Sequence, residues 1–460
     1  MDKDIFFTQF GHLAQGPGGI KKLRDLILQL AVQGKLVEQD PDDEPASLLF
    51  ERIAAYRDDL IRQKKIRKAQ PFSEVEDGEK YFSIPAKWRW CRFGELGDWG
   101  AGATPNRKQS TFYGGTIPWF KSGELTGGVI TSSEETVTEE ALQKSSLRVN
   151  MPGDVMVAMY GATIGKTAVA GIECTTNQAV CACTPFDGVF NEYLHIGLKA
   201  YRPIFTDQGA GGAQPNISRV KIIHTPFPIP PLTEQKRIVA KVDELMGVCD
   251  ELEAQQNEHV ALKRDCVAST LHHLTEAADA ADINTNWSIT QNNFQNWFND
   301  PQTVKTLRAT ILQLAVQGKL VPQDPNDEPA SVLLEKVSDE KEKLIEAKVI
   351  KKQKPLPEIN LRDEPCNLPR DWKWVRFGDL FMSSEYGTSE KAMATESSGV
   401  PVYAMGHIQN RELMDGKFKY LKYESDSLPK LYLKHKDLLF NRTNSYELVG
   451  KTAIYWGNDD

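Results

Sequence analysis

The stretch LRDLILQLAVQGKLVEQDPDDEPASLL, residues 23–49, recurs almost unchanged as LRATILQLAVQGKLVPQDPNDEPASVL, residues 307–333. Only five of the 27 positions differ, and the offset between the copies is 284 residues. The offset continues beyond the motif without a gap, so that Trp88 corresponds to Trp372. A period of this length is not that of a solenoid, whose repeats span roughly 20–50 residues. The chain therefore contains a duplicated unit, in which a helical arm precedes a globular module.

Each arm is predicted to form two helices. Leu23, Ile27 and Leu30 lie at helical spacing, and Gly34 follows as a stop signal. The DPDDEP turn then leads into a second periodic segment. The two helices of the first copy are expected within 20–36 and 46–68, and those of the second within 304–318 and 330–352.

A longer helix is predicted from Leu232 to about Thr275, where apolar residues keep a helical period. At 1.5 Å per residue it would be roughly 60 Å long, which is too long for a small core, so it must pack against another helix. The expected partner is 304–352, folding back antiparallel after the polar segment 277–299. The basic clusters at 61–68 and 348–354 are interpreted as solvated helix ends in preference to a nucleic-acid patch.

The globular modules differ in character from the arms. Short Val-, Ile- and aromatic-rich runs between turn residues predict strands with a few helices in residues 88–231. That segment holds twelve basic and twelve acidic residues. Beyond residue 94 the copies diverge but keep a common skeleton, in which 117–118, 154–157 and 165–168 correspond to 400–401, 437–440 and 450–453. The near-identical arms indicate that both copies of the arm perform the same task. The divergent modules indicate that each module performs its own version of a similar task.

Composition narrows the class of protein. A chain of 460 residues with 40% hydrophobic and 26% charged residues predicts two to four globular domains. No apolar run reaches the length of a membrane helix, and the start lacks the pattern of a secretory signal. The seven scattered cysteines are interpreted as reduced thiols of a cytoplasmic protein. The net charge of −8 argues against a uniformly basic DNA-binding surface but leaves local positive stripes possible.

The sequence contains none of the common catalytic or cofactor-binding motifs. GATIGKT at 161–167 has three residues between its first glycine and the Gly-Lys pair, where a phosphate loop needs four. The second copy, SYELVGKT, lacks the first glycine, so we expect a turn that holds backbone close to a partner. The sequence has no GxGxxG, GxSxG or HExxH motif and no cysteine spacing typical of a metal site. The chain is therefore predicted to bind without chemistry, metal or cofactor of its own.

The arm motif and four further segments resemble one family. The further segments are IPWFKSGEL at 117–125, TTNQA at 175–179, GAQPNIS at 212–218 and FPIPPLTEQKRIVAKVDELM at 227–246. With them, the chain resembles the specificity subunit of type I restriction-modification enzymes over nearly its whole length. The resemblance implies an α+β fold, in which two mixed α/β target recognition domains are separated by long antiparallel helical arms in a pseudo-twofold repeat. The expected parts are an N-terminal arm (1–75), a first domain (85–231), a central coiled coil (232–352) and an incomplete second domain (370–460).

The resemblance also implies the function. Each recognition domain would read one half of a split double-stranded DNA target, while the arms set the spacing and dock two modification subunits. Restriction or motor subunits would join for cleavage. S-adenosylmethionine, ATP and Mg²⁺ are expected on the partners, and none is expected on this chain. Two other readings remain, a structural adaptor that reads no sequence and a free-standing DNA-binding regulator.

Candidate DNA contacts are polar residues in glycine-rich or polar turns. Asn and Gln side chains match adenine edges, and Lys and Arg match guanine or phosphate. Each has turn chemistry or a buried hydrogen bond as the alternative, and the repeated tryptophans are expected to be core. The candidates are Arg107, Lys108, Lys121, Tyr160, Thr163, Lys166, Asn177, Gln178, Gln214, Asn216 and Arg442.

The second module is shorter than the first. Position 460 corresponds to position 175, so roughly 100 residues of a complete second unit have no counterpart by repeat comparison. We therefore expect either a truncated chain or a half subunit that dimerises. The N-terminal arm, 20–68, would then lack a partner helix within the chain. On that view its apolar residues Leu26, Leu30, Leu49 and Ile53 would be uncovered and would drive self-association or poor solubility.

Overall fold

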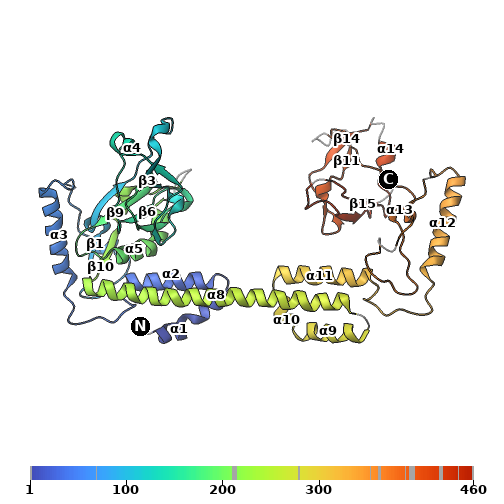
Figure 1. The fold of residues 1–460 in the computed structure, drawn as a ribbon, viewed down its shortest axis with the longest axis horizontal. Helices are drawn as coiled ribbons and strands as arrows, with labels where there is room; N and C mark the ends of the chain where they lie inside the picture. Colours follow the sequence, from blue (N-terminus) through green and yellow to red (C-terminus); the bar gives the residue numbers. More distant parts are fainter. Residues whose placement is uncertain are drawn as a thin grey trace. The chain divides into compact units, whose positions relative to one another are not determined.

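The computed structural model describes residues 3–68, 70–209, 215–277, 280–352, 354–360, 364–388, 390–392, 399–423, 428–443 and 445–457. Its contacts divide the chain into two units, Met1–Asp265 and Cys266–Asp460, and each is a structure in its own right. Both units combine helices with β-sheets (Figure 1), which confirms the predicted α+β class. Of the helices within the described ranges, none is both long and apolar enough to cross a lipid bilayer.

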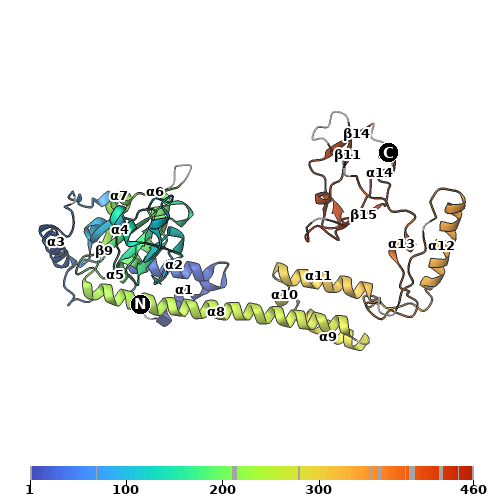
Figure 2. The same ribbon diagram turned by 45° about the horizontal axis from the view of Figure 1, so that its top comes forward.

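Long helices form the arm of the first unit. They are α1 (Lys3–Phe10), α2 (Gly19–Val32), α3 (Ala46–Arg62) and the first part of α8 (Leu232–Glu276). Helix α2 runs antiparallel to α8, as three contacts in reverse order show. Gln256 Nε2 donates to Ala14 O at 2.9 Å, Arg24 pairs with Asp250 at 2.6 Å, and Gln39 bonds to Glu234. Both views place α2 along α8 (Figure 2).

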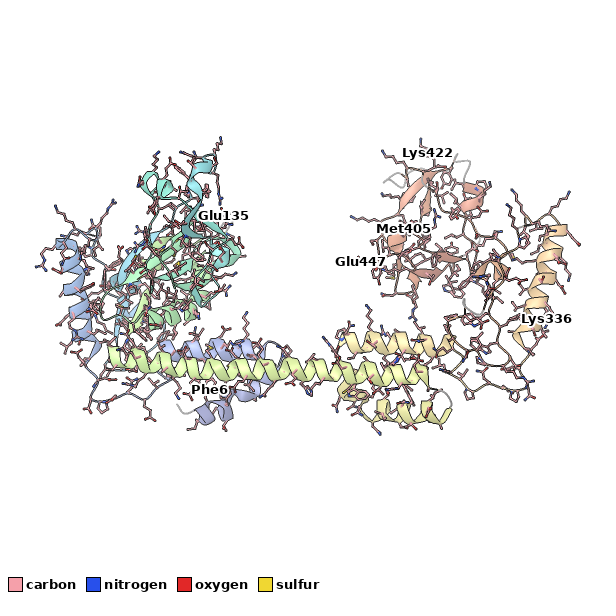
Figure 3. All side chains as sticks on the ribbon, viewed as in Figure 1. Phe6, Glu135, Lys336, Met405, Lys422 and Glu447 are labelled. Atoms are coloured by element: carbon pink, nitrogen blue, oxygen red, sulfur yellow. The ribbon has the colours of Figure 1, made fainter. Side chains whose placement is uncertain are left out.

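The N-terminal arm therefore has its partner helix within the chain, and the expectation of an uncovered arm is wrong. Leu23, Ile27 and Ala31 on α2 are fully buried in one core with Ile238 and Leu245 on α8. Phe6 of α1 is buried in the same core (Figure 3). On α3, Leu49 and Ile53 are 1% exposed and pack beside Gly188 of the first module. The apolar face that the sequence correctly located is thus covered by α8 and by the module.

A five-stranded sheet forms the centre of the first module. Its order is β2 (Gly97–Ala101), β9 (Val180–Pro185), β6 (Val155–Ala158), β7 (Thr167–Ala170) and β4 (Val129–Ile130). A second sheet has the order β5 (Glu135–Val137), β3 (Tyr113–Phe120) and β8 (Thr175–Thr176). The helices are α4 (Glu139–Lys144), α5 (Asn191–Ala200), α6 (Arg202–Gly209) and α7 (Arg219–His224). Strands β6, β7 and most of β9 are buried, because alanine, valine and cysteine fill them on both faces.

The two ends of this module meet in a short ladder. Strand β1 (Arg89–Arg92) pairs antiparallel with β10 (Pro226–Ile229). Phe93 and Phe227 stack there, with ring centroids 4.4 Å apart. Trp88 is 6% exposed and donates to Glu234 at 2.9 Å, which confirms its predicted core position. The ladder fixes the module onto the start of α8.

The second unit repeats the arm with different packing. It contains the end of α8, followed by α9 (Ala280–Asn292), α10 (Phe294–Trp297), α11 (Pro301–Val316) and α12 (Ala330–Glu346). Leu307 on α11 is buried with Val267, Leu271 and Leu274 of α8. Lys319, just after α11, donates to Thr275 O at 2.6 Å, so the C-terminal ends of both helices meet.

Helix α11 is therefore parallel to the end of α8, and the predicted antiparallel pairing of 232–275 with 304–352 is wrong. The antiparallel partner of α8 is α2, and α12 is a separate helix with no buried residue. Two helices, α9 and α10, occupy the segment expected to be a polar linker. They return the chain along α8 before α11 begins (Figure 1).

The described part of the second module contains short antiparallel pairs. They are β11 (Gly399–Val402) with β14 (Lys419–Lys422), β12 (Ile408–Gln409) with β13 (Glu412–Leu413), and β15 (Leu438–Phe440) with β16 (Thr452–Ile454). Two short helices, α13 (Phe377–Leu380) and α14 (Leu428–Leu431), complete it. The β15–β16 hairpin pairs Leu439 with Ala453, as β6–β7 pairs Met156 with Ala168. This register confirms the skeleton inferred from the sequence, with two residues inserted in the turn.

A buried histidine in the first module gives a pH prediction. His195 on α5 lies 2.9 Å from Thr167 Oγ1, and burial lowers its pKa to about 3. The unfolded chain protonates this histidine near pH 6.5, so this contribution to stability is complete above pH 6.5 and is lost as the pH falls toward 3. At pH 5.5 the expected loss is about 1.4 kcal/mol. Urea unfolding at pH 7.5 and 5.5 should show a smaller pH difference for His195→Gln, and an unchanged one for the exposed His272→Gln. Equal pH dependence in all three proteins would contradict the assignment.

Candidate nucleic-acid interface

Arg107 is positioned by aromatic side chains of the small sheet. Trp119 Nε1 donates to Ala103 O at 3.0 Å, and Tyr113 Oη donates to Pro105 O at 2.7 Å, which together hold the 103–108 loop. The Arg107 guanidinium then lies 4.6 Å from the centre of the Tyr113 ring and 4.9 Å from that of Trp119. Stacking of this kind fixes the orientation of a guanidinium and leaves its edge available.

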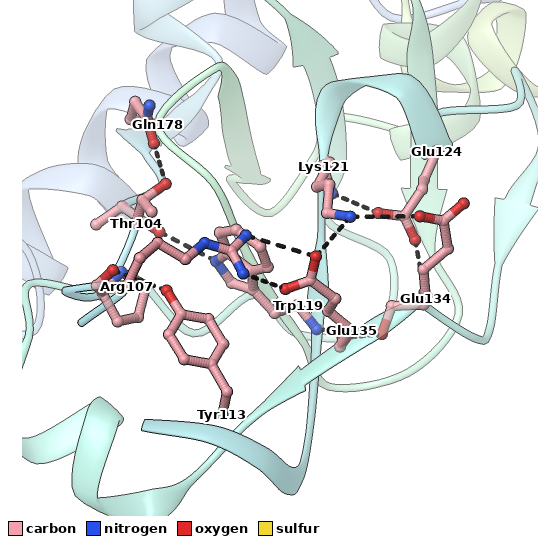
Figure 4. Close-up of polar contacts among 12 residues, drawn as sticks. Thr104, Arg107, Tyr113, Trp119, Lys121, Glu124, Glu134, Glu135 and Gln178 are labelled. Carbon is pink, nitrogen blue, oxygen red and sulfur yellow. Dashed lines mark hydrogen bonds and ion pairs between the residues drawn. The ribbon is translucent and has the colours of Figure 1, made fainter. Parts of the chain in front are cut away.

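Glu135 joins this arginine to Lys121 (Figure 4). Its carboxylate lies 2.5 Å from Arg107 and 2.7 Å from Lys121, and Glu134 adds a longer contact to Lys121. The hydrogen bond from Arg107, reinforced by Lys121, lowers the pKa of Glu135. The same pairing raises the pKa of Arg107 and of Lys121. Arg107 and Lys121 are therefore both charged, and the carboxylate of Glu135 balances part of their positive charge. The side chains of all three residues remain accessible to solvent.

Two amides continue the surface from Lys121. Asn177 N donates to Phe120 O at 2.9 Å, which holds the 177–179 turn beside Lys121. The Asn177 Oδ1 atom accepts from Ala179 N at 3.1 Å. Exposed Gln178 accepts a hydrogen bond from Thr104 (Figure 4). Among the residues that the structure describes, neither side-chain amide nitrogen has a hydrogen-bond partner, so each is available as a donor.

The GATIGKT segment lies directly beside these amides. Met159 N donates to Ala179 O at 2.8 Å, and Ile217 N donates to Met159 O at 2.9 Å. Tyr160 is 43% exposed, and the backbone of Tyr160 forms an isolated antiparallel β-bridge with Asn216. Thr163 Oγ1 donates to Tyr160 O at 2.7 Å, and Lys166 N donates to Thr163 O at 2.9 Å. These contacts join the turn to the 177–179 segment on one side and to 215–217 on the other.

This segment connects two antiparallel strands, β6 and β7, which confirms that it is a turn. A phosphate loop leads from a strand into a helix, whereas Thr167–Ala170 is a strand. Gly161 and Gly165 have φ of 59° and 73°, a conformation that glycine adopts without strain. A side chain at Gly165 would also collide with Arg202.

Nine predicted residues thus lie on loops that contact one another, and we call this set of residues the loop rim. It consists of Arg107, Lys108, Lys121, Tyr160, Thr163, Lys166, Asn177, Gln178 and Asn216. Of the ion pairs found in the described part of this module, none involves Lys108 or Lys166. Gln214 lies outside the described residues, and Arg442 belongs to the second unit.

Arg442 occupies the equivalent turn of the second module. Its guanidinium lies 4.2 Å from the centre of the Tyr386 ring, so it too is stacked on an aromatic side chain. Asn441 N donates to Lys451 O at 2.9 Å, as Ala158 N donates to Lys166 O at 2.8 Å. The two turns are therefore alike in backbone and different in side chains, which is the pattern of a common scaffold for different ligands.

The sequence did not indicate Glu135, Thr104 or Glu124. Glu124 accepts from the backbone nitrogens of Lys121 and Glu134 and so fixes two loops together. No local pattern links positions so far apart in the chain, but the charged segment SSEETV at 132–137 was a usable signal. Within the described ranges, no three His, Cys, Asp or Glu side chains lie close enough together to hold a metal ion.

The chain is similar to known specificity proteins. Residues 85–262 match the family described as the type I restriction modification DNA specificity domain. The EcoEI specificity subunit of Escherichia coli is 33% identical over 451 residues, covering 95% of this chain and 75% of that relative. The EcoAI specificity subunit of Escherichia coli is 36% identical over 378 residues, covering 79% of this chain. A solved structure of the HsdS subunit from Thermoanaerobacter tengcongensis matches with 21% identity and a TM-score of 0.33, covering 55% of this chain and 52% of that one.

The chain therefore belongs to the family of type I restriction enzyme specificity subunits, which confirms the resemblance found in its sequence. It spans 62% of the length of its EcoAI relative.

Proposed function

We propose that this chain is the sequence-reading DNA subunit of a type I restriction-modification complex and performs no catalysis itself. The observation that supports this most directly is the loop rim. It presents amide donors and cations from several loops of the two sheets of the first module, in a member of the specificity-subunit family. Base edges in the major groove are read by such groups, held at fixed positions. The first module would read one half of a bipartite target and the second module the other.

The rim divides into contacts of two kinds. Asn177, Gln178 and Asn216 are suited to base edges, since an amide can pair bidentately with adenine. Lys108 and Lys166, free of carboxylates in the described module, are suited to phosphate. Arg107 would reach a guanine or a phosphate by exchanging its contact with Glu135.

The arms would have the second task, as the resemblance implies. We propose that they set the spacing between the half-sites and dock two modification subunits, which supply S-adenosylmethionine. Motor subunits would supply ATP and Mg²⁺ chemistry, and the complex would act in the cytoplasm. Much of the charge that neutralises the DNA would then come from partners, in keeping with the net charge of −8.

Methylation by the assembled complex tests this proposal. The chain is co-purified with modification subunits and incubated with genomic DNA and S-adenosylmethionine, and the methylated sites are sequenced. We expect one bipartite site, and no methyl transfer by the chain alone. The double variant Asn177→Ala/Gln178→Ala should lose roughly 5- to 150-fold discrimination in one half-site, which corresponds to about 1–3 kcal/mol.

The same double change at Gln63 and Gln70, both exposed in the described structure and outside the module, is the control. Methylation without sequence preference by the complex with the original chain would support a structural adaptor instead. Unchanged discrimination in the double variant would remove the two amides from the interface. Sequence-specific binding by the isolated chain, without modification subunits, would support a free-standing regulator.

A charge change at Glu135 gives a separate prediction. Glu135→Gln removes a carboxylate that pairs with two rim cations and that would repel phosphate. We expect the assembled complex to bind non-specific DNA several-fold more tightly, with a salt dependence steeper by about one counterion. Fluorescence anisotropy at several salt concentrations measures both. Glu244→Gln, which breaks the ion pair with Lys241 on α8, should change neither. Weaker binding by Glu135→Gln would mean that the carboxylate mainly orients Arg107.

A further inference from the structure

The turn at 177–180 fixes the orientation of the Asn177 amide. Val180 N donates to Asn177 O at 3.1 Å, which closes the turn, and Ala179 N donates to Asn177 Oδ1 at 3.1 Å. Asparagine commonly makes this contact with the backbone two residues later. Because a backbone nitrogen can only donate, the contact also establishes which end of the amide is the oxygen. The Asn177 oxygen is therefore directed at its own turn, and the nitrogen is the end left for a ligand.

Thr104 fixes the orientation of the second amide in the same sense. Ala103 N donates to Thr176 O at 3.0 Å, which holds this segment against the start of the turn. The Thr104 hydroxyl then donates to Gln178 Oε1 (Figure 4). Thr104 and Gln178 are both exposed, so their hydrogen bond orients the glutamine side chain at the surface and is not part of the core. Two neighbouring amides thus have their oxygens occupied within the module and their nitrogens unoccupied.

This orientation distinguishes among the bases. In the major groove guanine presents two acceptors, O6 and N7, whereas adenine presents the N7 acceptor beside the N6 amino donor. Cytosine presents a donor, and thymine presents one acceptor beside a methyl group. An amide pairs with adenine by using its oxygen and its nitrogen together. Asn177 and Gln178 could do so only by turning their oxygens away from Ala179 and Thr104, whereas their two nitrogens already match guanine.

We propose that Asn177 and Gln178 read a guanine in the half-site of the first module, and that Thr104 is the positioning residue that disfavours adenine there. The two amide nitrogens donate to O6 and N7 of this guanine. Thr104 does not touch the base and acts through Gln178. The inference rests on the proposed DNA reading and adds the identity of one base.

The substitution Gln178→Glu tests which base is read. The assembled complex of the chain with modification subunits is first used to determine the methylated site by sequencing. Initial methylation rates are then measured on duplexes that carry each base pair in turn at every position of the half-sites. Glutamate keeps the shape of glutamine but presents an oxygen where the nitrogen was, and carboxylates accept from cytosine N4. We expect the preference for guanine at one position to fall roughly tenfold and cytosine to be accepted there. Gln70→Glu, the same change at an exposed residue outside the module, should leave every preference unchanged.

The substitution Thr104→Val tests the positioning role. Valine has nearly the shape of threonine but lacks the hydroxyl, so Gln178 becomes free to turn its oxygen toward a base. The ratio of the rates with guanine and adenine at the same position should fall by about fivefold or more. Thr104→Ser retains the hydroxyl and should retain the ratio. Folding should be unaffected in both variants because Thr104 is exposed, and circular dichroism checks this.

The outcomes separate this inference from the proposed function. A purely structural role of Thr104 would lower methylation of all duplexes equally and leave the guanine-to-adenine ratio unchanged, which would overturn the proposal. An A·T pair at the position that responds to Gln178→Glu would also overturn it. In both cases the bipartite site would persist, and the proposed function would stand. Methylation without sequence preference by the original complex would overturn the proposed function and this inference together.

Discussion

Exchanging residues 95–226 for the corresponding module of another specificity subunit is expected to replace one half of the methylated target and leave the other half unchanged. The structure supplies the reason. The whole loop rim lies inside the exchanged segment, whereas the second module lies outside it. The two ends of the exchanged segment lie next to each other, since Phe93 N donates to Thr225 O at 3.2 Å beside the β1–β10 ladder. A module can therefore be replaced at one narrow point of the fold.

Side chains of the exchanged segment pack on residues outside it, so the experiment needs a control for folding. Tyr201 and Phe205 from the exchanged segment pack on Phe93, and Gln29 of α2 donates to Ala200 O at 2.7 Å. A donor module needs equivalents of these residues, so circular dichroism melting of the hybrid accompanies sequencing of the methylated sites. The original half-site should disappear completely, a change larger than any rim substitution produces. A folded hybrid that altered both halves, or neither, would contradict modular reading.

The arm helices were predictable because their signals are local. The expected segments 46–68 and 232–275 correspond to α3, Ala46–Arg62, and α8, Leu232–Glu276. The alignment of Gly165 with Gly450 likewise anticipated two hairpins of equivalent register. Periodicity and turn chemistry act over a few residues, and a repeat shows them twice.

The partner of each helix could not be predicted in this way. Ile27 and Ile311 lie in nearly identical sequences, yet only Ile27 is fully buried. An apolar stripe indicates that one face of a helix will be buried, but it does not indicate which part of the protein will bury it. The parallel course of α11 depends on α9 and α10, which the polar composition of 277–299 concealed.

The rim was predictable as a set of residue types but not as a charged network. Loop position and side-chain chemistry indicated nine residues that the structure brings together. The pairing of Arg107 and Lys121 through Glu135 depends on three separate segments meeting. Such a contact follows from tertiary structure alone, and it decides which cations are free for a ligand.

The matched substitutions Ile27→Ala and Ile311→Ala should lower the free energy of unfolding of their two units by different amounts. Ile27 is fully buried between α2 and α8, so its truncation should lower the free energy of unfolding of the first unit by about 2–5 kcal/mol. Ile311 is 37% exposed, and the same change should lower the stability of the second unit by less than about 1 kcal/mol. The substitutions are chemically identical within nearly identical sequences, so helix propensity cancels in the comparison.

Hydrogen exchange followed by mass spectrometry measures each unit by itself. Ile27→Ala should reduce protection across α2 and the start of α8, whereas Ile311→Ala should change protection only within α11. Equal losses in the two variants would show that both arms are covered to the same extent, and the contrast between the copies would then have no basis.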